Sequence, residues 1–109
     1  MADLVIVELC TLIDDSSLDS KIREDLDSLN GDTWNYNDTF GCQFMVIAAI
    51  QNGVASLWQG DWEHNGKFFN ALDDAGRIIL SKEEFDDNIS KGCMKPCGET
   101  IKVGSHYEC

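Results

Sequence analysis

The last segment of the chain carries four residues whose side chains can bind a metal ion. Cys93 and Cys97 lie four positions apart, and His106 and Cys109 follow at a spacing of three. Two thiolates close together on a turn, joined by an imidazole and a third thiolate from the next segment, can complete a tetrahedral zinc site. These four residues are therefore a candidate site for structural zinc, with no open coordination position for a substrate.

The ligand types resemble those of Cys-Cys-His-Cys zinc knuckles, although the spacing differs from theirs. Gly98, directly after Cys97, suits a knuckle because glycine lets the backbone turn tightly. A disulfide between Cys93 and Cys97 and a set of free thiols are the alternatives. The five cysteines are an odd number, which in a reducing compartment favours free thiols or metal ligands. On the zinc hypothesis, the protein is an adaptor that binds its partner through the 92–109 tail.

Cys42 is the second residue that could do chemistry. A cysteine at the start of a helix, with a histidine elsewhere in the fold, is the arrangement of papain-like thiol enzymes. His64 and His106 are the two histidines that could activate Cys42. This hypothesis requires residues 40–51 to be helical, because a helix N-terminus lowers the pKa of a thiol. The sequence identifies no third residue that would orient the histidine.

Acidic residues are the dominant chemical feature of the chain. It has 20 Asp and Glu against 8 Lys and Arg, and a net charge of −12, whereas a small soluble domain usually carries about 2–8 charges. Such a surface repels nucleic acid and anionic membranes and attracts basic proteins. The acids that we expect on two helices, and propose as partner-binding residues, are Asp14, Asp15, Asp19, Glu24, Asp25, Asp27, Glu83, Glu84, Asp86 and Asp87.

The first functional hypothesis is therefore a non-enzymatic inhibitor that engages a basic nucleic-acid-binding protein. Carboxylates spread over a rigid surface can imitate the phosphate rows that such proteins recognise. In size and charge the chain resembles small phage inhibitors of restriction enzymes and CRISPR complexes, a resemblance of class that rests on no motif. The alternative for such charged segments is an ordinary solvated helix face.

The N-terminus lacks the basic region and cleavage pattern of a signal peptide, which predicts a cytoplasmic protein without membrane contact. The uncharged stretch 40–60 has only seven consecutive apolar residues at its centre, 44–50, whereas a membrane span needs about 20. We therefore expect this stretch to form the middle of a soluble core. The length of 109 residues predicts a single domain over 1–109.

The elements that must position these residues follow from turn signals. Asn52-Gly53 separates two apolar segments, 42–50 and 54–63, and is the strongest short hairpin signal. Asn65-Gly66 and Gly76 mark further turns, which predicts strands over 67–72 and 77–80. A buried helix over 40–51 is the alternative to the first hairpin, because periodicity alone cannot assign a short apolar run.

Two helices complete the prediction. Leu18, Ile22, Leu26 and Leu29 form an apolar stripe at helical spacing, with N-cap candidates at 14–17. Ser81 with Glu84 is a capping box that starts a second helix ending at Gly92. A strand is expected over 4–9, with a helix extending through 12–13 as the competing interpretation.

The predicted fold class is α+β, an antiparallel meander of about four to five strands with two helices packed on it. Its expected core residues are Phe44, Val46, Ile47, Ile50, Leu57, Phe68, Ile78, Leu80, Ile22, Leu26 and Phe85.

Overall fold

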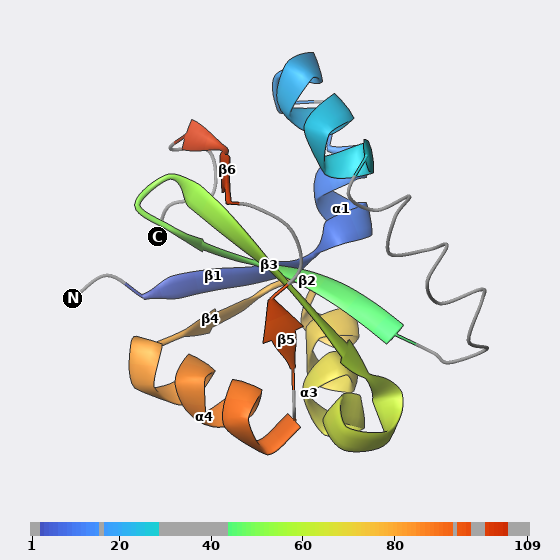
Figure 1. Ribbon diagram of the computed structural model, residues 1–109, viewed down its shortest axis with the longest axis vertical. Coiled ribbons are helices and arrows are strands. Elements are labelled where there is room, and N and C mark those ends of the chain that lie inside the picture. Colours follow the sequence, from blue (N-terminus) through green and yellow to red (C-terminus); the bar gives the residue numbers. More distant parts are fainter. Residues whose placement is uncertain (1–2, 16, 29–43, 93, 97–99, 105–109) are drawn as a thin grey trace.

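The computed structural model describes residues 3–15, 17–28, 44–92, 94–96 and 100–104 (Figure 1). An antiparallel sheet forms its centre, with strand order β4-β1-β2-β3-β5, and β6 also pairs with β3. Helices cover both faces of this sheet. The predicted α+β class is therefore confirmed, with more helical segments than the two that were expected.

The chain begins with strand β1 (Leu4–Glu8), which continues directly into the short helix α1 (Leu9–Asp14). Both interpretations of this segment are thus partly correct, because a strand and a helix follow each other. The next helix covers residues 20–28. Its N-cap is Asp19, whose Oδ1 accepts a hydrogen bond from the backbone N–H of Lys21 at 2.9 Å, so the predicted cap at 14–17 was placed too early.

The central hairpin is formed by β2 (Phe44–Gln51) and β3 (Val54–Asp61). Asn52 and Gly53 at its turn have φ angles of 53° and 76°, the left-handed values that a two-residue type I′ turn requires. The predicted hairpin is confirmed, and the alternative helix over 40–51 is wrong for the described residues 44–51. The predicted second strand ends at Asp61, two residues earlier than expected.

Helix α3 (Trp62–Ala75) replaces the strand predicted over 67–72. The Asp61 side chain caps its first turn by accepting from the backbone N–H of His64, and Phe69 and Leu72 face the core at helical spacing. The predicted turn at Asn65-Gly66 is therefore wrong. The predicted turn at Gly76 is instead the left-handed end of α3, with φ of 77°.

Strand β4 (Ile78–Leu80) pairs with β1 and not with the preceding segment, so the sheet is not a simple meander. Helix α4 (Lys82–Gly92) follows it. The capping box is present, because the backbone N–H of Glu84 donates to Ser81 Oγ and the N–H of Ser81 donates to Glu84 Oε2. The two short strands β5 (Lys95–Pro96) and β6 (Ile101–Lys102) add to the β3 edge.

The sheet is buried on both faces, which explains the uninterrupted apolar run of β2. Val46, Ala48 and Ile50 pack on one side with α1 and the helix over residues 20–28, and Met45, Ile47 and Ala49 pack on the other with α3 and α4. A strand that is covered on both faces needs apolar residues at every position, not at alternate ones.

The predicted core list is largely confirmed. Among its members, Val46, Ile47, Ile50, Leu57, Leu26 and Phe85 are buried, and Phe68, Ile78, Leu80 and Ile22 are partly buried against the two clusters. The side chain of Phe44 lies outside the described part of the structure. The prediction missed the buried residues of α1 and α3, Leu9, Leu12, Phe69 and Leu72.

Candidate functional site

The predicted partner-binding acids form two groups on opposite faces of the sheet. Asp14, Asp15, Asp19, Glu24, Asp25 and Asp27 lie on α1, on the helix over residues 20–28, or between them, and Glu83, Glu84, Asp86 and Asp87 lie on α4. The helices of the first group cover one hydrophobic cluster, and α4 covers the other (Figure 1). The ten residues therefore do not form one continuous surface, and each group must be considered separately.

The acids of α4 are largely engaged within their own helix. Lys82 Nζ lies 2.7 Å from Asp86 Oδ1, and Lys91 Nζ lies 3.0 Å from Asp87 Oδ2, both at the i,i+4 spacing. Glu84 takes part in the capping box with Ser81. This arrangement stabilises the helix and compensates two of its four carboxylates locally.

The negative charge of the acidic group on the other face of the sheet is less compensated by nearby cations. Lys21 pairs with Asp25 at 2.9 Å, and Asp19 serves as the helix cap. Among the described residues, no ion pair is formed by Asp14, Glu24 or Asp27, and all three are exposed. The surface formed by α1 and the helix over residues 20–28 is called the acidic face below. Its acids are Asp14, Asp15, Asp19, Glu24, Asp25 and Asp27.

Arg23 is the one arginine on the acidic face, and it forms no ion pair with the described acids there. Its Nε donates a hydrogen bond of 2.9 Å to the carbonyl oxygen of Ile13, near the end of α1. A basic side chain at this position satisfies a carbonyl group that the short helix leaves without an intrahelical partner. Arg23 therefore joins the two helices of the acidic face and fixes their relative position.

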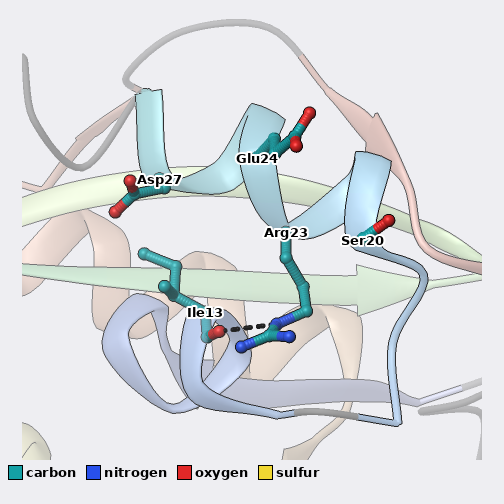
Figure 2. Close-up of a pocket in the computed structure, with 5 residues that line it drawn as sticks. All are labelled: Ile13, Ser20, Arg23, Glu24 and Asp27. Atoms are coloured by element: carbon teal, nitrogen blue, oxygen red, sulfur yellow. Dashed lines mark hydrogen bonds between the residues drawn. The ribbon is translucent and has the colours of Figure 1, made fainter.

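An open cavity of about 360 Å³ lies between the two helices of the acidic face, and Figure 2 shows the residues that line it. The lining consists of Ile13, Ser20, Arg23, Glu24 and Asp27. Glu24 and Asp27 are three positions apart on the helix, and Figure 2 shows their carboxylates pointing in different directions from it. The sequence prediction had both acids but could not show that they border a cavity.

His64 forms a pair with a residue that the sequence prediction missed. Its Nδ1 lies 2.9 Å from Asp61 Oδ1 and 3.1 Å from Asp61 Oδ2, so the carboxylate accepts the ring N–H and orients the imidazole. The hydrogen bond and the charge of Asp61 raise the pKa of His64. The backbone N–H of His64, followed by its side chain, lowers the pKa of Asp61. The sequence signal that could have revealed this pair is an aspartate three residues before a histidine, since Asp61 caps the helix on which His64 lies.

This pair provides a base and its orienting residue, but the part of the chain that the structure describes places no nucleophile beside it. Within the described ranges, no thiol or hydroxyl group is hydrogen-bonded to His64. Cys42 and His106, the other members of the thiol-enzyme hypothesis, lie outside those ranges. Cys10 is an exposed free thiol on α1, across the sheet from α3, and donates to Glu8 Oε2 at 3.1 Å.

The zinc hypothesis stays a prediction, because Cys93, Cys97, His106 and Cys109 all lie outside the described residues. In the part of the chain that the structure does describe, no group of three or more His, Cys, Asp or Glu side chains is arranged to hold a metal ion. No helix within the same part has both the length and the apolar character needed to cross a membrane.

Comparison of the chain with protein-family models found no match, and searches of curated proteins and of solved structures found none either.

Proposed function

We propose that the protein is a non-enzymatic binding protein whose acidic face engages a basic surface of a nucleic-acid-binding protein. The observation that carries the proposal is the difference between the two acidic groups. Two of the four acids of α4, Asp86 and Asp87, are paired with lysines of the same helix, whereas Asp14, Glu24 and Asp27 form no ion pair within 4 Å in the described structure. Uncompensated charge attracts an oppositely charged partner and accelerates its association.

The helix over residues 20–28 holds the carboxylates of Glu24 and Asp27 on a rigid support, and Asp14 is the last residue of α1. Leu18 and Leu26 are buried in the cluster beneath it, Ile22 packs against that cluster, and Arg23 ties the helix to α1. A fixed array of negative charges can occupy the surface that a partner uses for phosphates. The result would be an inhibitor that competes with nucleic acid for the partner.

The first test is capture of partners from a lysate with the tagged protein, followed by elution with a rising salt gradient and identification by mass spectrometry. We expect a stoichiometric nucleic-acid-binding protein that salt releases, because ions screen exposed charge pairs. Added DNA or RNA should displace the same protein. If salt and nucleic acid both leave the captured protein in place, the proposal is wrong.

Two triple variants with equal charge change make the test specific. Asp14→Asn, Glu24→Gln and Asp27→Asn remove three charges from the acidic face, and Glu83→Gln, Asp86→Asn and Asp87→Asn remove three from α4. We expect the first set to weaken partner binding roughly tenfold or more, and the second set to have a much smaller effect. Equal losses in both would show that only net charge matters. Circular dichroism controls for correct folding.

A further inference from the structure

We propose that the outer edge of strand β4 pairs with the same edge of a second copy of the chain, so that two copies share one continuous antiparallel sheet. Strand β4 ends the strand order and is hydrogen-bonded to β1 on its inner side (Figure 1). No described strand pairs with its outer side. The backbone groups of such an edge are a template for another strand. This surface is separate from the acidic face, and the inference does not depend on the proposed function.

The side chain of Ile79 shows that this edge is accessible. Ile79 is 48% exposed, and among the described residues no other large apolar side chain is exposed. It pairs with Val5 of β1, which is buried in the cluster beneath α1, so the apolar face of the sheet continues past that cluster to Ile79. Ile78 and Leu80 pack against the cluster on the other face. A neighbouring strand would cover Ile79 and remove its apolar surface from water.

The edge is self-complementary, which favours a second copy as its occupant. An antiparallel two-fold pairing over the full length of β4 places Ile79 opposite Ile79 of the copy, and Ile78 opposite Leu80 of the copy. Within the strand, apolar side chains then meet only apolar side chains. Pairs of this kind across antiparallel strands stabilise a sheet.

The charges at the two ends of β4 match the same pairing. Arg77 lies just before the strand, and Glu83 lies after it in the first turn of α4. Within the described residues, neither side chain takes part in an ion pair. The pairing puts Arg77 opposite Ser81 of the copy, two positions from its Glu83, and a long side chain can reach such a diagonal neighbour. The two-fold axis repeats this contact, so the junction gains two pairs of opposite charges, which an unrelated strand would not supply.

Sedimentation velocity of the full chain measures the association directly. We expect a reversible and weak dimer, because β4 has three residues and two chains with a net charge of −12 repel each other. Ile79→Lys should weaken the dimer by about tenfold or more, since a lysine on an edge strand opposes pairing. Asn70→Lys adds the same charge at an exposed position of α3 and should have little effect. A chain that stays monomeric up to about 1 mM, or a dimer that Ile79→Lys leaves intact, overturns the inference.

A charge exchange tests the identity of the partner and the register together. Arg77→Glu and Glu83→Arg should each weaken self-association, because each change brings like charges together at both ends of the junction. Mixing the two variants should restore the dimer, since every contact in the mixed dimer again joins opposite charges. Circular dichroism of each variant controls for folding. A mixture that associates no better than the separate variants would contradict the proposed pairing.

Discussion

The side-chain amide of Asn65 donates a hydrogen bond of 2.9 Å to the carbonyl oxygen of Gly92, which joins the start of α3 to the end of α4. The same nitrogen donates to the carbonyl oxygen of Asp61 at 2.8 Å. Asn65 is 3% exposed and is the buried polar side chain of the described structure. One amide group therefore satisfies two carbonyl groups and sets the contact between two helices on one face of the sheet.

Replacing Asn65 by Leu should destabilise the protein by about 2–3 kcal/mol, because the carbonyl group of Gly92 loses its side-chain donor in a buried environment and that of Asp61 loses one of its donors. Urea denaturation followed by tryptophan fluorescence measures the change. Asn70→Leu is the matched control, since Asn70 is exposed on the same helix and should change stability by no more than about 0.5 kcal/mol. Equal effects at the two positions would contradict the role assigned to Asn65.

Two glycine-to-alanine substitutions should change the stability of the protein in opposite directions. A Cβ atom at Gly92 would overlap Oδ1 of Asn65, so Gly92→Ala should break the helix contact and cost about 1–3 kcal/mol. A Cβ atom at Gly66, inside α3, would have Trp62 Cε3 as its nearest neighbour at 4.0 Å. Gly66→Ala should therefore stabilise the protein by about 0.5–1 kcal/mol. Thermal melting of both variants checks the pair, and a stabilised Gly92→Ala would count against the packing described here.

Removing the capping box of α4 should cost about 1 kcal/mol. Ser81→Ala leaves the backbone N–H of Glu84 without its side-chain acceptor, which now lies at 3.2 Å. Ser90→Ala, at an exposed position near the other end of the helix, is the control and should be nearly neutral. Chemical denaturation measures both, and hydrogen exchange should show faster opening of the first turn of α4 in Ser81→Ala only.

The pair of Asp61 and His64 predicts a pH dependence of stability. The pKa of His64 is raised, so its contribution is complete below the ordinary histidine pKa of about 6.5 and is lost as the pH rises through the folded-state pKa. The pKa of Asp61 is lowered, so its contribution is present above about 3.9 and is lost as the pH falls through the folded-state pKa. The pair should therefore stabilise most between about pH 4 and 6.5.

A histidine titration by NMR gives the direct measurement. We expect the pKa of His64 to lie above about 6.5 in the native protein and to return toward that value in Asp61→Asn. The stability difference between the protein and His64→Gln should shrink as the pH is raised from 5.5 to about 8.5. A constant difference over that range would show that the pair does not titrate as proposed.

Much of the fold could be predicted from the sequence because several turn, cap and apolar-spacing patterns form the same local structure in the folded protein. Asn52-Gly53 adopts the turn that its residues favour, with both φ angles positive, and Ser81 with Glu84 starts a helix through contacts only three residues apart. The apolar stripe of Leu18, Ile22 and Leu26 covers the sheet as its spacing indicates. In each case, the information lies within one or two turns of the chain.

Tertiary structure decided the features for which local signals were misleading or silent. Asn65-Gly66 favours a turn, but the hydrogen bond from Asn65 to Gly92, 27 residues away, and the packing of Trp62 on Phe69 support a helix there. The sequence shows acids on two helices, whereas only the tertiary arrangement places those helices on opposite faces of the sheet. The acids of α4 find lysines at local spacing, but the cavity beside Glu24 and Asp27 forms only because α1 packs next to their helix. Composition thus determined the strong negative charge, and the packing of helices on the sheet determined where that charge is available.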